Sequence, residues 1–493
     1  MKKTSIYAIG SIIGVGLTLS LQTYATPSSV NDLLPVKEIK TFAEVYGQIK
    51  ANYYENTEDA RLIENAMKGM VSGLDPHSEY LNQEDFNGLM EQTTGKFGGL
   101  GIEIVKDESF IKIVTPIEDT PAFRAGLKPN DYIIKIDSVS TKGMSTMEAS
   151  KKMRGKPGTY VTLTIVRKDE LKPFDLKLKR DTINIKTVKS QLVEPGIGYI
   201  RVNSFKEQTL EDFVEHINAL TRENGKPLDG LVFDLRNNGG GLLNSAVGLT
   251  AVFIPENSVV VSTKGRDNIK QTVLRANKND YRNPMDGSMF KDPLANLPAE
   301  IKKLPITLLV NGGSASASEI VTGALQDYQR AVVVGTRSFG KGSVQTIIPL
   351  GNNDGIKLTV ALYYTPKDRS IQARGIVPDI IVKTEDDDFF GFREVDFNNH
   401  LSNPKGEEVK GSLSKPLENE KLDKKAKEEK TLKIKEKILK ESSYNYMPDP
   451  KQDIQLKKSI EITKNTAEWK KALGRYKINE RKIVQEEKKD KKD

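Results

Sequence analysis

A run of small residues from Asn311 to Glu319 is the first place where side-chain types and spacing could support chemistry. It leaves an apolar, strand-like segment and enters a helical one at Ser316. A turn of this kind presents a side chain at a helix N-terminus, where free N–H groups favour developing negative charge. Ser316 is therefore a candidate nucleophile. The same residues also fit a capping box, in which Ser316 caps the helix and Glu319 reaches back to it.

A lysine in a glycine-rich loop follows the next apolar segment. Residues 335–343 read Gly-Thr-Arg-Ser-Phe-Gly-Lys-Gly-Ser, close to the phosphate-binding pattern G-x-x-x-x-G-K-[ST]. Two features argue against nucleotide binding. Gly342 stands where a magnesium-binding hydroxyl is needed, and residues 344–349 have strand character instead of forming the helix that would receive phosphate.

The alternative role for this lysine is that of a general base. A lysine can act so only when its pKa falls from about 10.4 towards neutrality, and burial lowers it because the ammonium form is disfavoured. The glycines beside Lys341 allow close backbone packing, and Phe339 supplies apolar cover. We expect neutral Lys341 to take the proton of Ser316. An exposed lysine in a turn is the competing interpretation.

A third glycine cluster, Asp234 to Gly241, follows another apolar strand. Glycines at a strand end allow backbone N–H groups to point at an oxyanion, and they are equally common in plain turns.

Composition narrows the chemistry further. The 493 residues include no cysteine, which excludes disulfides, thiolate nucleophiles and cysteine-based metal sites. The only histidines, His77, His216 and His400, are far apart and in no metal-ligand spacing. We therefore expect neither a metal nor a cofactor, and no Ser-His-Asp triad.

Charge is concentrated at one end of the chain. Residues 404–493 hold 26 Lys+Arg and 18 Asp+Glu, so they account for the whole net charge of +8. The remainder is neutral, which gives no reason to expect a nucleic-acid partner. The tail has the composition of a solvated segment. Residues 450–475 differ because Ile454, Leu456, Ile460, Ile462 and Trp469 provide apolar surface, so this stretch is expected to dock on the body or on a partner.

The first 25 residues have the form of a secretory signal peptide. Lys2 and Lys3 precede an apolar stretch at 6–21, and Thr-Tyr-Ala at 23–25 fits a cleavage site. An uncleaved membrane anchor is the alternative, since the stretch approaches the roughly 18 residues that can span a bilayer. Either way we expect an exported, periplasmic protein.

The remaining chain divides into four regions. Apolar residues at helical spacing indicate a helical N-terminal region at 34–94. Short strand-like runs broken by glycine fill 95–182. Strands alternate with helices across 183–385, which predicts a layered α/β core. A charged, partly helical C-terminal region at 386–493 follows.

At these residues the sequence resembles the C-terminal processing, or tail-specific, serine peptidases across roughly 34–385. The resemblance rests on six ordered motifs: Leu74–Leu81, Gly98–Ile102, Asp234–Gly241, Ser314–Glu319, Phe339–Gln345 and Gly375–Asp379. It implies an α/β and β multi-domain protein, with a PDZ domain inserted before a layered, crotonase-like peptidase core.

The resemblance also implies roles for single residues. Ser316 is the nucleophile, Lys341 the base, and Gln345 the residue that orients the lysine. Backbone N–H groups of Gly240 and Ala317 are the implied oxyanion donors. One departure is visible, because the family usually has a proline where this chain has Gly239. We therefore expect a looser loop at Gly239, which would reduce the preorganisation of the oxyanion hole.

In such a PDZ domain, backbone N–H groups hold the terminal carboxylate of an extended peptide. Leu100, Gly101 and Ile102 would supply them, and Ile102 with Ile104 would line a pocket for an apolar last side chain. Arg154 could report occupancy of this site to the active site. The expected function is an exported endopeptidase that recognises protein or peptide substrates by apolar free C-termini; the alternative is a catalytically silent envelope scaffold. The family also suggests homo-oligomers and an adaptor protein as partners.

Overall fold

The computed structural model describes residues 35–107, 109–266, 271–282, 292–384, 391–409 and 446–482. The expected signal peptide and the tail segment 410–445 lie outside the described residues. The chain divides into two compact units, residues 1–70 and 71–493. Within the described ranges, no helix combines the length and the apolar character needed to cross a bilayer.

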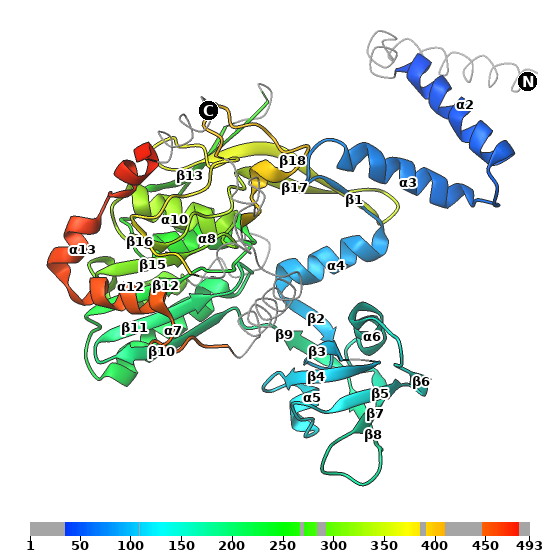
Figure 1. Cartoon of the computed structure of the whole chain (residues 1–493), viewed down its shortest axis with the longest axis horizontal. Helices are drawn as coiled ribbons and strands as arrows, with labels where there is room; N and C mark the ends of the chain where they lie inside the picture. The colour runs from blue at the N-terminus through cyan, green and yellow to red at the C-terminus, as the bar shows by residue number, and fades with distance from the viewer. Residues whose placement is uncertain are drawn as a thin grey trace, which may run out of the picture. The chain divides into compact units, whose positions relative to one another are not determined.

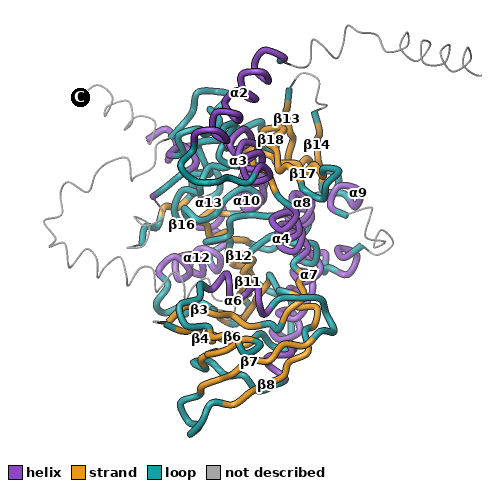
Figure 2. Tube along the Cα trace, turned by 90° about the vertical axis from the view of Figure 1, so that its right-hand side faces the viewer, coloured by secondary structure: helices purple, strands orange, loops and turns teal. Residues whose placement is uncertain are grey.

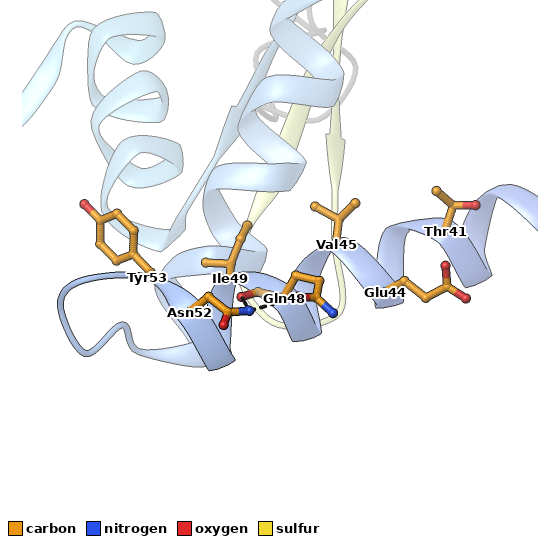
Figure 3. A pocket seen from close by; sticks show the side chains of 7 residues that line it. All are labelled: Thr41, Glu44, Val45, Gln48, Ile49, Asn52 and Tyr53. Atoms are coloured by element: carbon orange, nitrogen blue, oxygen red, sulfur yellow. Dashed lines mark hydrogen bonds between the residues drawn. The ribbon is translucent and has the colours of Figure 1, made fainter.

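The first unit contains helix α2 (Val36–Asn52) and most of α3 (Asp59–Ser72). An ion pair of 2.7 Å between Lys50 and Asp59 connects them. No side chain of α2 is buried. Val45, Ile49 and Tyr53 lie along a hollow of about 590 Å³ on this helix, beside the hydrogen-bonded Gln48 and Asn52 (Figure 3). Among the described residues, α2 therefore leaves apolar side chains such as Val45 and Ile49 exposed.

A six-stranded sheet forms the centre of the second unit, in the order β10-β11-β12-β15-β16-β19. Its strands are β10 (Val188–Glu194), β11 (Ile197–Val202), β12 (Gly230–Asp234), β15 (Ile306–Val310), β16 (Val332–Gly335) and β19 (Ile380–Ile381). Only β10 pairs antiparallel to its neighbour; the others are parallel. The carboxyl ends of β12, β15 and β16 therefore lie at one edge of the sheet.

Helices cover both faces of this sheet, as Figure 1 shows. Leu231, Phe233 and Leu308 face a core shared with three helices, α7 (Thr209–Asn224), α8 (Leu243–Ala251) and α10 (Ala317–Asp327). Val232 and Leu309 point to the opposite face and pack with α12 (Ile454–Lys464) and α13 (Thr466–Ala472). This alternation is expected of parallel strands that are buried on both sides.

The C-terminal helices confirm the expectation that 450–475 docks on the body. Leu456, Ile460 and Ile462 are at most 4% exposed, and each contributes roughly 1.5–3 kcal/mol by burial. The indole N–H of Trp469 donates to the carbonyl of Ile306 at 2.8 Å. Ile454, by contrast, is 53% exposed and lies outside this contact.

A second, antiparallel sheet supports the lysine loop. It contains β1 (Glu79–Leu81), β13 (Val259–Gly265), β14 (Thr272–Arg275), β17 (Ser343–Pro349) and β18 (Gly355–Tyr364). Strand β18 pairs with β1, β13 and β17. The short helices outside these layers are α9 (Lys278–Tyr281), η2 (Pro293–Asn296), η3 (Ala299–Lys302) and η5 (Glu394–Asp396).

The segment between α4 (Gln83–Thr94) and β10 forms a separate β-structure with its own core. Its strands are β2 (Lys96–Gly99), β3 (Ile102–Asp107), β4 (Phe110–Pro116), β5 (Tyr132–Ile136), β6 (Val139–Ser140), β7 (Tyr160–Val166), β8 (Phe174–Lys179) and β9 (Asp181–Asn184). Strands β3, β4, β5, β7 and β8 form one antiparallel sheet (Figure 2). Helices α5 (Pro121–Arg124) and α6 (Thr146–Met153) complete it. Ile111, Ile133, Leu163 and Ile165 are fully buried between these elements.

Candidate active site

Three loops meet at the carboxyl edge of the central sheet: residues 235–241, 311–316 and 336–342. The Asn311 side chain connects the first two, because its oxygen accepts from the N–H of Asn237 (2.9 Å) and its nitrogen donates to the Asn237 side chain (2.7 Å). The N–H of Phe339 donates to the carbonyl of Ser314 (3.0 Å) and so attaches the third loop. The parallel strands thus bring together the three glycine-rich motifs singled out in the sequence.

The three serines of the Ser-Ala-Ser-Ala-Ser run have different surroundings. Ser314 and Ser318 are fully buried, and their hydroxyls donate to the carbonyls of Leu235 and Asn238, both at 2.8 Å. These two serines therefore fix the glycine loop. Ser316 remains partly exposed at the N-cap of α10. Of the three hydroxyls, only that of Ser316 lies where an approaching substrate could meet it.

Ser316 also has an unusual backbone, with φ +55° and ψ −114°. A non-glycine residue in such a region costs on the order of 1–3 kcal/mol, and it persists only where its surroundings enforce it. The N–H of Ser316 donates to the Glu319 carboxylate (2.8 Å), and its carbonyl accepts from the Tyr363 hydroxyl (3.2 Å) and the Ile320 N–H (3.0 Å). These contacts hold both sides of the strained residue.

Glu319 connects the serine to the lysine loop. Its fully buried carboxylate accepts from the N–H groups of Ser316 (2.8 Å), Gly340 (2.7 Å) and Lys341 (3.0 Å), and from the Ser338 hydroxyl (2.6 Å). Burial raises the pKa of Glu319 to about 7, although these donors favour its ionised form. In the expected capping box, the contact from the Ser316 N–H to the Glu319 carboxylate is present. The same carboxylate also binds the N–H groups of the lysine loop.

The linking role of Glu319 was missed by reasoning from the sequence. The available signal was a single glutamate among the small and apolar residues that open a buried helix. The Tyr363 hydroxyl makes a parallel connection, since it donates to the carbonyls of both Ser316 and Lys341. Ser316 and Lys341 are thus joined through one carboxylate and one phenol.

Lys341 is partly buried in its loop. Burial, and then the nearby charge of Lys357, lower the pKa of Lys341 to about 8, while Glu394, Glu319 and Asp75 oppose this change. A fraction of the amine is therefore neutral near physiological pH, as a general base requires.

Gln345 lies on β17, where its side-chain nitrogen donates to the hydroxyls of Ser343 and Thr359, both at 3.0 Å. Among the described residues, no hydrogen bond joins Gln345 to Lys341. Its role in orienting the lysine stays a prediction, and Ser343 and Thr359 are the residues whose contacts with it are visible.

Gly240 and Ala317, the expected oxyanion donors, lie next to each other. A Cβ atom on Gly240 would be 3.0 Å from the nitrogen of Ala317 and 2.9 Å from the Cβ of Ser316. The Gly240 N–H, however, donates to the side chain of Asn238 at 2.9 Å. The hydrogen bonds formed among the described residues do not use the N–H of Ala317. In this conformation one of the two expected donors is occupied.

The residues that precede this glycine loop form a buried charge network. Asp234 is fully buried, which would raise its pKa, but Arg236 and Arg201 outweigh burial and lower that pKa to about 2. Arg236 pairs at 2.7 Å with both Asp234 and Asp453, the N-cap of α12. The Asp-Leu-Arg part of the motif thus anchors the glycine loop to the C-terminal helix. The sequence offers no signal for this distant contact.

The expected carboxylate-binding loop of the β-structure is preformed. Gly101 has φ +76°, and its carbonyl accepts from the Ile117 N–H at 2.9 Å. Among the described residues, the N–H groups of Leu100 and Gly101 take part in no hydrogen bond. Ile102 and Ile104 are partly buried at the start of β3 and pack against the local core.

Arg154 ends α6 and is exposed. Its guanidinium pairs with Glu91 on α4 at 2.8 Å and lies over the ring of Phe97, 4.7 Å from its centroid. No described contact joins it to the Ser316 or Lys341 loops. Arg154 therefore connects the β-structure to the helix that precedes it, and its role as a reporter stays a prediction.

Three family models match the chain. Peptidase family S41 matches residues 196–382, the PDZ domain 98–178, and the activating protease CtpB N-terminal domain 18–85. The carboxy-terminal-processing protease of Bartonella bacilliformis is 42% identical over 384 residues, 78% of this chain and 83% of that protein. The carboxy-terminal processing protease CtpA of Bacillus subtilis is 35% identical over 344 residues, 70% and 68% of the two chains.

A solved structure, the photosystem II D1 C-terminal processing protease, is 27% identical with a TM-score of 0.39, covering 69% of this chain and 86% of that one. The sheet of parallel strands, the added β-structure and the sequence matches together define the class. The chain belongs to peptidase family S41, and it is a serine-type peptidase that carries a PDZ domain. The fold class expected from the sequence is confirmed.

Proposed function

We propose that this chain is an exported serine endopeptidase in which Ser316 is the nucleophile and Lys341 the general base. The observation that carries the proposal is the Glu319 carboxylate, which binds the N–H groups of both residues at 2.8 and 3.0 Å. The partial exposure of Ser316 and the lowered pKa of Lys341 support the same roles.

In the proposed reaction, the Ser316 hydroxyl attacks the peptide carbonyl carbon while its proton passes to the neutral Lys341 amine. The N–H groups of Ala317 and Gly240 stabilise the oxyanion, once Gly240 turns away from Asn238. Lys341 then gives the proton to the leaving amine as the C–N bond breaks. Water, deprotonated by the same lysine, hydrolyses the ester and returns the hydroxyl.

The proposed substrate is a polypeptide with a free, apolar C-terminus. The N–H groups of Leu100 and Gly101 could bind its carboxylate, and Ile102 and Ile104 its last side chain. The names of the relatives, carboxy-terminal processing proteases, support this substrate class. A carboxylate anchor and a cleavage site on one chain would together select unfolded tails.

The location and partners are proposed on other grounds. The signal-like first 25 residues support export to the periplasm, and an uncleaved segment that anchors the protein to the membrane is the alternative. The apolar side chains of α2 support homo-oligomers or an adaptor contact. The homo-oligomer is tested by replacing Val45 and Ile49 by serine and measuring the mass of the assembly in solution. An unchanged mass contradicts a role of this helix in assembly.

The catalytic roles are tested with an unstructured, fluorescent polypeptide ending in Leu-Val. Ser316→Ala and Lys341→Ala should each reduce turnover at least about a thousandfold, because removing one member of a nucleophile–base unit disables the unit. Both variants should still bind the tail, and a polypeptide with an amidated C-terminus should bind poorly to all forms. Cleavage by Ser316→Ala would place the nucleophile elsewhere. Tail binding without cleavage by the unaltered protein would favour a silent scaffold.

A further inference from the structure

The motif Leu74–Leu81, which the proposed reaction does not use, lies beside the strands that carry Gln345 and its neighbours. Strand β18 pairs on one side with β1, the end of this motif, and on the other with β17 (Figure 1). Thr359 on β18 is the register partner of Gln345 on β17. Side chains of residues that face each other in this way lie on the same face of the sheet and interact. Thr359 can therefore contact both the motif and Gln345.

Asp75 is the residue of the motif that Thr359 contacts. The Thr359 hydroxyl donates to its carboxylate at 3.0 Å. The same carboxylate accepts from the N–H groups of His77 (2.9 Å) and Ser78 (3.1 Å) and from the Ser78 hydroxyl (2.6 Å). Burial would raise the pKa of Asp75, but these hydrogen bonds outweigh burial and lower that pKa. Asp75 is therefore ionised at neutral and alkaline pH, and an ionised carboxylate can only accept hydrogen bonds.

This carboxylate fixes the direction of the hydrogen bonds around Thr359. A threonine hydroxyl has a single proton, and a charged acceptor such as Asp75 forms the stronger bond with it. The Ser78 hydroxyl lies 3.4 Å from that of Thr359, but its own proton is used in the shorter bond to Asp75. The Thr359 oxygen is thus left to accept from Gln345, at 3.0 Å, so the side-chain nitrogen of Gln345 must face Thr359.

The direction of this bond determines which end of the Gln345 amide remains for the lysine. The amide nitrogen donates to the hydroxyls of Thr359 and Ser343, both at 3.0 Å, and so uses both of its hydrogens. Among the described contacts, the amide oxygen accepts no hydrogen bond. It is therefore available to an N–H of Lys341.

A general base must direct its lone pair at the proton that it removes. A neutral lysine amine has two N–H bonds and one lone pair, so an N–H bound by a carbonyl oxygen leaves the lone pair of Lys341 for the proton of Ser316. An amide NH₂ group facing the lysine would instead donate to that lone pair and compete with the serine proton. The orientation of the Gln345 amide therefore decides whether it assists or blocks the base.

We propose that Thr359 is a positioning residue for the base. Because its proton is bound to Asp75, Thr359 holds the nitrogen of the Gln345 amide and leaves the amide oxygen for the lysine. The inference rests on the proposed role of Lys341 and on the orienting role expected of Gln345. Thr359 has no described contact with Ser316 or Lys341 and acts through Gln345.

The test is steady-state cleavage of the fluorescent polypeptide ending in Leu-Val. Thr359→Val keeps the branched shape of the side chain and removes the hydroxyl, so the Gln345 amide can turn. The kcat should fall about tenfold, the effect of losing one hydrogen bond, while KM stays the same. Thr359→Ala, which places no additional methyl group beside Asp75, should behave alike.

Thr359→Ser is the conservative variant, because it restores the hydroxyl. It should recover most of the kcat that Thr359→Val loses. If Thr359→Ser is as slow as Thr359→Val, the packing of the side chain and not its hydroxyl is important, and the inference is overturned.

The double variant Thr359→Val/Gln345→Ala shows whether Thr359 acts through Gln345. Gln345→Ala removes the amide, so it should lower kcat at least as much as Thr359→Val does. Adding Thr359→Val should then lower kcat no further, since two residues that act as one unit are not additive. Losses that multiply in the double variant, or an unchanged kcat in Gln345→Ala, would overturn the inference.

Ser343→Ala is the matched control. Ser343 lies at the same 3.0 Å from the same nitrogen, but its hydroxyl has no other described partner and can either donate or accept. It therefore does not set the orientation of the amide, and Ser343→Ala should lose less kcat than Thr359→Val. Equal losses would show that the direction of the hydrogen bond is unimportant and would contradict the proposal.

Failure of the inference can be separated from failure of the proposed function. If Ser316→Ala and Lys341→Ala abolish cleavage but Thr359→Val cleaves like the unaltered protein, only the role of Thr359 is wrong. If Lys341→Ala still cleaves, the lysine is not the base, and both ideas fail.

Discussion

Two glycine loops in this chain are each expected to bind an anion through backbone N–H groups. They differ in whether the described contacts already use those N–H groups. In the PDZ loop, the described contacts leave the N–H groups of Leu100 and Gly101 available. In the catalytic loop, the Gly240 N–H is bonded to the Asn238 side chain at 2.9 Å. The expected site for the terminal carboxylate is thus open, while half of the expected oxyanion hole is occupied.

The difference lies in what surrounds each loop. Asn238 is fully buried, and it also donates to the carbonyl of Val202 at 2.7 Å, so its side chain is fixed in place. Turning Gly240 towards a substrate carbonyl requires the loop to move relative to Asn238. We therefore expect tail binding to need little rearrangement and catalysis to need more, and three substitutions test this contrast.

The largest effect is expected at Gly240. Its φ is +104°, and the added Cβ of Gly240→Ala would lie 2.9 Å from the carbonyl oxygen of Ala315 and from the Cβ of Ser316. Turnover should fall at least about a hundredfold, as for the loss of an oxyanion donor, because the added methyl group would displace the Gly240 N–H from the oxyanion. Tail affinity, measured by fluorescence anisotropy, should not change.

The control for Gly240→Ala is Gly225→Ala. Gly225 also has positive φ, +71°, but its Cβ would meet no atom within 4 Å. The turnover of Gly225→Ala should stay near that of the unaltered protein. Equal losses in the two variants would attribute the effect to general backbone strain and contradict an oxyanion role.

A smaller effect is expected at the PDZ loop. The Cβ of Gly101→Ala would lie 2.4 Å from the buried side chain of Thr120, so the loop must shift. Tail affinity should weaken roughly tenfold, since forcing a residue with a Cβ into this conformation costs about 1–2 kcal/mol. Gly126→Ala has nearly the same φ and free space around its Cβ, and it should bind normally. Undiminished affinity in Gly101→Ala would place the carboxylate elsewhere.

The smallest effect is expected at Gly239, where the resemblance predicts a looser loop. Gly239 is exposed, and a Cβ there would meet nothing within 4 Å. Gly239→Pro should raise turnover by up to about fivefold, because a compatible proline reduces backbone freedom by an amount worth about 0.4–1 kcal/mol. Steady-state kinetics measure this directly. A clear decrease would show that the loop needs the freedom of glycine to rearrange.

Sequence reasoning reached the site through motifs whose effects are local. The loop after β15, the glycine-rich loop that holds Lys341 and the glycine loop before β3 were all predicted from neighbouring residues. The contacts that connect distant segments were beyond it: Glu319 with the lysine loop, Arg236 with Asp453, and His77 with Glu394, 317 positions away. Such pairs depend on how the layers stack, which no local pattern encodes.

For α12, the sequence predicted that the helix docks but did not predict where. Leu456, Ile460 and Ile462 predicted docking because an isolated amphipathic segment needs a surface to cover. The face of the sheet that receives them could not be predicted, since both faces carry similar aliphatic side chains.

The most direct test of the central claim is the rate of Ser316 acylation in the unaltered protein as a function of pH. If Lys341 must be neutral, the rate should rise with pH through about 8 and then level off, because the pKa of Lys341 is lowered to about 8. A rate that stays constant from pH 9 down to pH 6 would contradict a lysine base.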